Sequence, residues 1–381
     1  MMIGIDAHKL SESVCVTDDD GNIMEEYSMN NTDESWRSFM EKYRESNPKI
    51  AVESSTTGKY VARLLRDHGF EVHLANPKGL KIIYGSGKKT DRNDARNIAK
   101  LLRLGELPES YLPSMDIDEI RTIIRYRRSL GEEMTAIKNS VHSLLTRNGI
   151  TIKASDIFGK RSLDAIIKSA GKLSVSDSIV LTDLMNRLQY VRERIERMQD
   201  KLASMGRNIP EVKILMTIPG IDYYSALAIY SEIGDITRFP DADHLASYTG
   251  LVPRVNQSGS VDIHGHITKS GPSVLRFFLV NSTHTLIKLS ASFKNIYRKL
   301  RKRIGKNRAI IAVARKLAVV IFNMLARKQC FVDDHWGRKL YERKLKAMES
   351  RGGRSKEFRY EDMERIIGMI SITSQSTKLL S

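Results

Sequence analysis

Hydrophobic and polar positions follow two different periods along the first hundred residues. Alternation with a period of two predicts strands, and apolar residues three or four positions apart predict amphipathic helices. The predicted elements are, in chain order, strands at 2–6, 13–17 and 23–29, a helix at 33–45, a strand at 49–53, a helix at 58–68, a strand at 71–74 and a helix at 91–104. This order predicts an α/β domain that begins with a three-stranded meander.

The pattern changes after a linker at 106–116, which contains Pro108 and Pro113. Long periodic stretches at 117–147 and 175–205 predict two helices that pair as an antiparallel coiled coil. Such a coiled coil would serve as a spacer or as a dimer contact. Further on, an apolar turn at 216–221 precedes a predicted helix at 223–233, in the manner of a helix-hairpin-helix element. Residues 250–271 are rich in loop formers, and helices are predicted at 272–289 and 296–328.

We therefore expect three folded parts and a tail. The expected segments are an α/β domain at 1–110, a helical coiled-coil or linker region at 111–207, a mainly α C-terminal domain at 208–346 and a polar tail at 347–381. A chain of 381 residues is long enough for two or three hydrophobic cores.

The positive charge of the chain is concentrated in one stretch. The chain has 62 Lys and Arg residues against 45 Asp and Glu residues, and its formal net charge is +17. Residues 288–346 hold 18 of the basic residues and only 3 of the acidic ones, so the remainder is close to neutral. Such a stretch predicts a surface that binds nucleic-acid phosphates, although a solvated helix face is the simpler alternative. The candidate contacts are Arg298, Lys299, Arg301, Lys302 and Arg303.

Composition argues against several other classes of protein. No apolar run approaches the roughly 18–20 residues of a membrane span, and residues 1–6 lack the features of a signal peptide. The only cysteines are Cys15 and Cys330, which favours the reducing cytoplasm over a disulfide-bonded fold. The sequence contains no Gly-rich phosphate loop with a lysine, so use of ATP is not indicated. We expect a cytoplasmic protein without a membrane partner.

Four acidic residues form a candidate metal site. Asp6 and Glu53 end predicted strands, and if those strands are neighbours both carboxylates emerge at one edge of the sheet. Asp91 and Asp94 share a face at the start of a predicted helix. An oxygen-rich site of this kind suits Mg²⁺, with Mn²⁺ as the alternative, and supports phosphodiester chemistry. Each acid also has a simpler explanation as a cap, a helix-dipole partner or an ion-pair partner.

Several short blocks in this order resemble the Asp-Glu-Asp-Asp transposases of bacterial insertion sequences. The blocks are Gly4-Ile5-Asp6 with Lys9, Val52-Glu53, residues 89–95, residues 218–221, residues 246–253, residues 257–259, residues 265–271 and Leu275-Arg276. The resemblance covers about residues 1–330. It implies a RuvC-like domain of the ribonuclease H superfold at the N-terminus and a recombinase that acts on element ends and target DNA. In many members a noncoding guide RNA, encoded in the element and of the bridge-RNA type, pairs with both DNAs.

The same resemblance implies a serine nucleophile in the C-terminal domain. Ser258 is the candidate and Ser260 its nearest rival, while an ordinary loop serine is the simpler alternative. A serine hydroxyl that attacks a phosphodiester holds the DNA end as a phosphoserine ester. Residues that would bind phosphate are Lys89, Arg254, Lys269 and Arg276. We hypothesise that serine and carboxylates act on one phosphate in a homo-oligomer, a dimer or a tetramer.

Three other functions fit part of the sequence. A RuvC-like Holliday-junction nuclease would use the same four acids and metal-activated water, but it leaves the Ser258 block unexplained. An actin-like or sugar-kinase ATPase would share the first strand and hairpin, but it requires a second Asp-Gly phosphate loop that is not found. A non-catalytic nucleic-acid-binding scaffold would need the basic stretch and not the acids.

Overall fold

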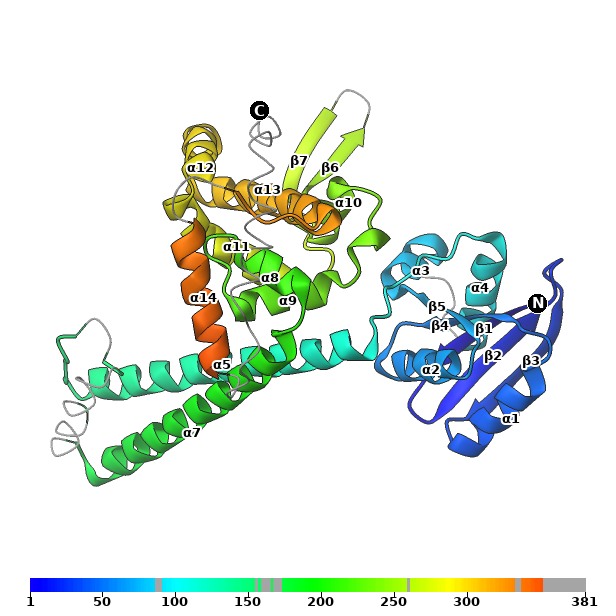
Figure 1. Cartoon of the computed structure of the whole chain (residues 1–381). Helices are drawn as coiled ribbons and strands as arrows, with labels where there is room; N and C mark the ends of the chain where they lie inside the picture. The colour runs from blue at the N-terminus through cyan, green and yellow to red at the C-terminus, as the bar shows by residue number, and fades with distance from the viewer. Residues whose placement is uncertain are drawn as a thin grey trace. The chain divides into compact units, whose positions relative to one another are not determined.

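The computed structural model describes residues 1–85, 91–154, 157–158, 166, 173–258, 261–332 and 337–351 (Figure 1). The chain divides into two compact units, Met1–Ser114 and Met115–Ser381. The first is an α/β unit and the second is mostly helical. Each unit has its own hydrophobic core.

A five-stranded mixed sheet forms the centre of the first unit. Its strands are β1 (Met2–Ala7), β2 (Ser11–Thr17), β3 (Ile23–Asn30), β4 (Lys49–Glu53) and β5 (Glu71–Ala75). They lie in the order β3-β2-β1-β4-β5. β1, β2 and β3 pair antiparallel, as expected for the leading meander, and β4 and β5 continue the sheet in parallel with β1. All predicted strands and helices therefore occur in the predicted order, and one further helix lies among them.

Helices cover both faces of this sheet. α1 (Asp33–Tyr43) and α2 (Thr56–Asp67) lie on one face, where Trp36, Phe39 and Leu65 pack against Ile3 and Ile5. The other face is covered by α4 (Asp91–Leu104), through its apolar residues. The alternation of strand side chains explains this division, because successive residues of β1 face opposite helices.

Two details of the first unit differ from the prediction. The Asn76-Pro77 pair was expected only to stop a strand, but it also begins α3 (Pro77–Tyr84). The Asn76 side chain accepts hydrogen bonds from the amides of Lys78 and Gly79, and proline is well suited to the first turn of a helix. The expected linker at 106–116 lies partly along β5, where the Ser110 amide donates to the Leu74 carbonyl at 2.6 Å.

The second unit begins with a pair of long helices, α5 (Met115–Arg147) and α7 (Val175–Gly206), which lie side by side in Figure 1. Buried apolar residues of α7 repeat at alternating spacings of three and four, which is the pattern of a helix that packs along one partner. These residues are Leu181, Leu184, Leu188, Val191, Ile195 and Leu202. All of these except Leu202 pack with a matching row on α5 that includes Leu130, Ile137 and Leu144. Leu202 belongs to the other core of this unit, with Ile120 and Ile124 of α5.

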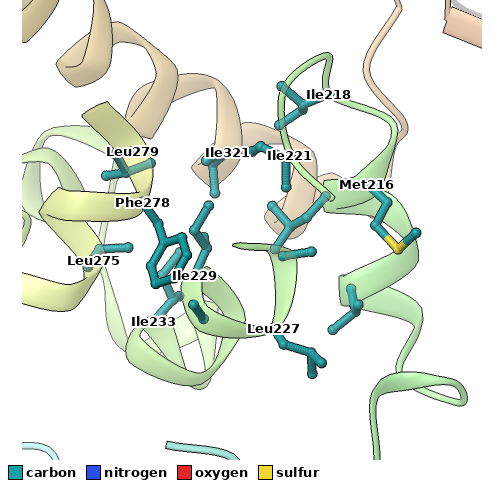
Figure 2. Close-up of a cluster of buried hydrophobic side chains, with 14 of the residues drawn as sticks. Met216, Ile218, Ile221, Leu227, Ile229, Ile233, Leu275, Phe278, Leu279 and Ile321 are labelled. Atoms are coloured by element: carbon teal, nitrogen blue, oxygen red, sulfur yellow. The ribbon is translucent and has the colours of Figure 1, made fainter. Parts of the chain in front are cut away.

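The second unit has a further set of elements, most of which pack around one core, shown in part in Figure 2. They are α8 (Pro210–Met216), α9 (Tyr223–Ile233), a 3-10 turn at Ile236–Arg238, α10 (Ala242–Tyr248), β6 (Pro253–Ser258), β7 (Val261–Ile267), α11 (Ser273–Leu289), α12 (Ala291–Ile304), α13 (Lys306–Arg327) and α14 (Gly337–Arg351). Ile229 of α9, Phe278 of α11 and Ile321 of α13 meet in this core, and α9 is buried along most of its length.

Three expectations for this unit need correction. The helix predicted at 296–328 is two helices, because Gly305 has a φ of 81° and separates α12 from α13. The region predicted as loop-rich at 250–271 contains the β6–β7 hairpin. The turn at 216–221 joins two helices as expected, but it is packed inside the core. A Cβ on Gly220 would lie 2.7 Å from the Ser282 carbonyl oxygen, so this glycine packs closely against α11.

Among the described helices, α13 alone is long and apolar enough to cross a membrane by length and composition. It contains no uninterrupted apolar run of that length, because Arg315 and Lys316 divide its apolar residues. Half of its most apolar window is buried inside the core. Helices in the cores of soluble proteins meet the same criterion, so this finding is weak evidence for a membrane span.

Candidate functional site

The acids predicted to bind metal are placed by three elements of the first unit. Asp6 lies near the end of β1, and Glu53 is the last residue of the adjacent parallel strand β4. The register pairs Ile5 with Val52, so Asp6 and Glu53 occupy the next position on each strand and share a face of the sheet. Asp91 and Asp94 lie in the first turn of α4, which packs on β1.

A glycine in β1 allows α4 to lie very close to the sheet. A Cβ on Gly4 would be 2.2 Å from the Ala95 carbonyl oxygen and 2.5 Å from the Ala99 amide nitrogen. Only a residue without a side chain fits this contact. Because Gly4 precedes Asp6 by two residues, both face α4, and the close approach brings the start of that helix to the Asp6 carboxylate.

The closest group of potential ligands contains Asp6, Asp91 and His8. His8 Nε2 lies 3.2 Å from Asp6 Oδ2 and 3.5 Å from Asp91 Oδ1. One ligand atom from each of the three residues lies within 4.8 Å of the others. Asp6 is 5% exposed, whereas Asp91 and His8 face solvent. Glu53 and Asp94 lie outside this group, although they belong to the same part of the unit.

The electrostatics of this group indicate a shortage of positive charge. Burial raises the pKa of the Asp6 carboxyl, and the carboxylates of Asp94 and Asp91 raise it further, while His8 only partly offsets these effects. Burial lowers the pKa of His8, but the negative charges of Asp6 and Asp91 outweigh it and the pKa is raised overall. A divalent cation among these oxygens would remove the repulsion between the carboxylates.

Sequence analysis did not identify His8, although the signal was available. In a strand, residues two positions apart point to the same face, so a histidine at position 8 extends the face that carries Asp6. Lys89, which was predicted to bind phosphate, lies outside the described residues.

The candidate serine lies on the β6–β7 hairpin of the second unit. Ser258 is the last residue of β6 and pairs with Val261. Ser260 lies outside the described residues. The base of the hairpin is formed by two chain segments that cross closely at glycines. A Cβ on Gly250 would be 2.1 Å from the Ser270 carbonyl oxygen, and one on Gly271 would be 2.0 Å from the Tyr248 carbonyl oxygen.

Of the basic residues predicted near the serine, Arg276 is engaged by the protein itself. Its Nη1 donates to the carbonyl oxygens of Thr249, Ser270 and Gly271 at 3.2, 2.9 and 3.1 Å. The guanidinium thus holds together the two crossing segments. Arg254 and Lys269 are exposed, and Arg254 makes one long contact of 3.5 Å with the Thr268 carbonyl oxygen.

The predicted phosphate contacts at 298–303 lie together on one helix. α12 buries Phe293 and directs its basic residues to solvent. Within the described part of the chain, none of Arg298, Lys299, Arg301, Lys302 and Arg303 forms an ion pair. By contrast, Lys42 and Arg96 of the first unit are paired with Glu25 and Glu26. α12 therefore carries a concentrated, uncompensated positive charge, as a helix that binds polyanions requires.

Comparison with known proteins gives similarities in both units. Residues 3–149 match the model of a transposase family of the DEDD type, and residues 212–298 match a family described as transposases of the IS116/IS110/IS902 family. The transposase for insertion sequence element IS1111A of Coxiella burnetii is 27% identical over 287 residues, which are 74% of this chain and 79% of that protein. A probable family 20 transposase of Pseudomonas aeruginosa is 26% identical over 74% of this chain and 85% of its own length.

Another similar protein, with a different name, is the pilin gene-inverting protein of Moraxella bovis. It is 31% identical over 156 residues, which are 37% of this chain and 48% of that protein. The similarities thus connect the chain with proteins named for the movement or inversion of DNA segments.

Proposed function

The chain belongs to the IS116/IS110/IS902 family of transposases, and from this premise we propose how it cuts and rejoins DNA. The carboxylate cluster of the first unit binds divalent metal, and a serine of the second unit is the nucleophile. The observation that carries the proposal is the buried Asp6 carboxylate, close to Asp91 and His8, at the end of a strand against which α4 packs tightly.

The residues present fit a divalent cation. Two carboxylate oxygens and an imidazole nitrogen lie within 4.8 Å of one another. Burial, together with the carboxylates of Asp94 and Asp91, raises the pKa of Asp6. Asp6, Glu53, Asp91 and Asp94 would hold Mg²⁺ or Mn²⁺. When bound, the cation supplies Lewis-acid stabilisation of the oxygens that gain charge during phosphodiester displacement.

The role of Ser258 is nucleophilic displacement at phosphorus. Its Oγ forms a bond to phosphorus as the bond from phosphorus to the leaving deoxyribose oxygen breaks. The hydroxyl proton passes to a base, and the leaving oxygen takes up a proton. Attack by the hydroxyl of another DNA end on the phosphoserine reverses these changes and releases the serine. The bond energy is retained, so rejoining consumes no nucleotide cofactor.

Three features support further parts of this proposal. The meander followed by parallel strands, with helices on both faces, agrees with a ribonuclease H-like fold for the first unit. The regular packing of α5 against α7 within one chain supports a coiled-coil spacer. The proposal also includes assembly of copies of the chain into a dimer or tetramer. The exposed charge of α12 supports binding of DNA and of an element-encoded guide RNA. A protein that acts on bacterial DNA would work in the cytoplasm, at the nucleoid.

The metal-site proposal is tested by Asp6→Asn in the full chain. We expect recombination of a plasmid that carries the element and its flanks to fall at least about 100-fold, with nucleic-acid binding retained. Asp67→Asn, at an exposed position at the end of α2, is the matched control and should leave recombination unchanged. Recombination at normal rates in Asp6→Asn would refute the metal-site proposal.

The serine proposal is tested by Ser258→Ala. We expect the covalent protein–DNA adduct, seen as a slower band on denaturing gels, to disappear. A persistent adduct would assign the nucleophile to another residue, with Ser260→Ala as the next variant. DNA cleavage without any adduct in the native protein would favour metal-activated water instead.

The guide-RNA proposal is tested on RNA that copurifies with the native protein. Sequencing should recover one predominant species encoded beside the gene, able to pair with the element and with its insertion site. A random sample of cellular RNA would contradict the proposal, even if α12 binds RNA well.

A further inference from the structure

His8 lies at a point shared by two carboxylates of the candidate metal site. A single ring nitrogen, Nε2, faces both Asp6 Oδ2 at 3.2 Å and Asp91 Oδ1 at 3.5 Å. The three residues come from different positions: the end of β1, the residue just beyond it, and the first turn of α4. Both of these contacts of the nitrogen are therefore with oxygens of the candidate metal site.

These separations match those of atoms bound to a common cation. Ligands at adjacent corners of an octahedron with bonds of about 2.1 Å are about 3.0 Å apart, so contacts of 3.2 and 3.5 Å need only a small contraction. A hydrogen bond is the simpler explanation for one of these contacts. However, one N–H points well at only one oxygen, whereas an unprotonated Nε2 and both oxygens can bind one cation together.

We propose that His8 Nε2 is a direct ligand of the divalent cation and that this nitrogen makes the site prefer Mn²⁺ to Mg²⁺. The inference rests on the proposed metal-dependent function and adds to it a ligand and a metal preference. Mg²⁺ favours sites made of oxygen, whereas an imidazole suits first-row transition ions. A site with one nitrogen among carboxylates therefore favours Mn²⁺ more than the four acids alone would.

The test compares the metal-free full chain with His8→Gln. Glutamine keeps a polar side chain of similar reach but offers an oxygen in place of the nitrogen. The control is His68→Gln, because His68 is an exposed histidine of the same unit and follows directly after the last residue of α2. Mn²⁺ affinity is measured from the free-ion signal in electron paramagnetic resonance, and Mg²⁺ affinity by competition. Pulsed measurements on bound Mn²⁺ detect the magnetic coupling of a directly bonded ¹⁴N.

We expect ¹⁴N coupling in the native protein and in His68→Gln, and its loss in His8→Gln. We also expect His8→Gln to weaken Mn²⁺ binding at least about tenfold while Mg²⁺ binding changes much less. Absence of ¹⁴N coupling in the native protein, or its persistence in His8→Gln, would overturn the inference. An equal loss of affinity for both ions would also overturn it.

The same measurements separate this inference from the proposed function. If Asp6→Asn abolishes Mn²⁺ binding and His8→Gln leaves ¹⁴N coupling intact, the metal site stands and only the role of His8 fails. If Asp6→Asn binds Mn²⁺ as tightly as the native protein does, the metal-site proposal itself fails. The native ¹⁴N signal needs no variant, so the inference is testable even if a substitution impairs folding.

Discussion

Glu12 is a buried carboxylate beside the candidate metal site. It lies opposite Ala7 in the β1–β2 pair, none of its surface is exposed, and neither carboxylate oxygen has a hydrogen-bond partner among the described residues. Burial raises the pKa of Glu12 to about 7, and the nearby His8 offsets this only in part. An unpaired carboxyl in such a place is more stable protonated than ionised.

The raised pKa of Glu12 predicts how the stability of the first unit depends on pH. Below about pH 4.5 the carboxyl is protonated in both the folded and the unfolded chain. Between about 4.5 and 7 the unfolded chain loses the proton and the folded chain keeps it, so the free energy of unfolding falls. Glu12→Gln should remove this fall. The free energy of unfolding of the variant, relative to that of the native protein, should therefore be higher at pH 8 than at pH 4 by up to about 3 kcal/mol.

Urea unfolding at several pH values measures the effect. Trp36 lies in the core of the first unit, and its fluorescence reports that unit if Trp336 is replaced by Phe in every protein compared. Glu45→Gln, at an exposed position, is the control, and its free energy of unfolding should depend on pH as that of the native protein does. Identical profiles for Glu12→Gln and Glu45→Gln would contradict the prediction.

Single residues also mark the limit of sequence analysis at this site. The acids at positions 6, 53, 91 and 94 were found because each stands at the end of a predicted element. His8 and Glu12 flank the tight turn after β1, where alternation indicates a face of the sheet but not what packs against that face. Their surroundings are set by α4 and by the neighbouring strands, which are brought together only by folding.

At the scale of elements, the contact between β1 and α4 fixes the relation of Asp6 to Asp91. Gly4→Ala would place a methyl group within the backbone of α4, at 2.2 Å from the Ala95 carbonyl oxygen. The helix must move away, which we expect to destabilise the first unit by about 1–3 kcal/mol and to weaken Mn²⁺ binding. Urea unfolding and metal titration measure the two effects.

Gly131→Ala provides a matched control for this change. Gly131 lies within α5, and a Cβ there would meet only the Arg127 side chain, at 3.7 Å. Replacing glycine by alanine inside a helix stabilises it by up to about 1 kcal/mol. If Gly4→Ala were also neutral or stabilising, the close approach of α4 would not be what positions the acids.

Elements were predicted well where one period persists and poorly where a short signal has two interpretations. The strands of the meander and α4 alternate or repeat long enough to be recognised. α3 was missed because Asn76-Pro77 both ends β5 and caps a helix. The division of α12 from α13 depends on the positive φ of one glycine, Gly305, and apolar residues continue on both sides of it.

At the scale of the whole molecule, charge and chemistry occupy different parts of the chain. The residues at 288–346 carry most of the net charge of +17, while the candidate metal ligands lie in the nearly neutral first unit. Sequence analysis located this charge but not its presentation, which depends on Phe293 turning one face of α12 into the core. We therefore interpret α12 as a surface that holds nucleic acid and takes no part in the chemical step.

This interpretation predicts a change in the salt dependence of binding. Each basic side chain that neutralises a phosphate releases a counterion, so the logarithm of affinity falls with the logarithm of salt concentration by about 0.9 per contact on duplex DNA. Replacing Arg301, Lys302 and Arg303 together by Gln should reduce this slope by up to about 3, whatever the DNA sequence. Fluorescence anisotropy of a labelled random-sequence duplex, between about 50 and 200 mM salt, measures it.

The control removes the same charge from the first unit. Arg37, Arg44 and Lys100 are exposed there, and their replacement by Gln lowers the net charge of the protein equally. If binding depended only on net charge, the two triple variants would lose affinity to the same degree and keep similar slopes. A reduced slope confined to the α12 variant would place the phosphates on that helix, while the metal affinity of the first unit should be unchanged in both proteins.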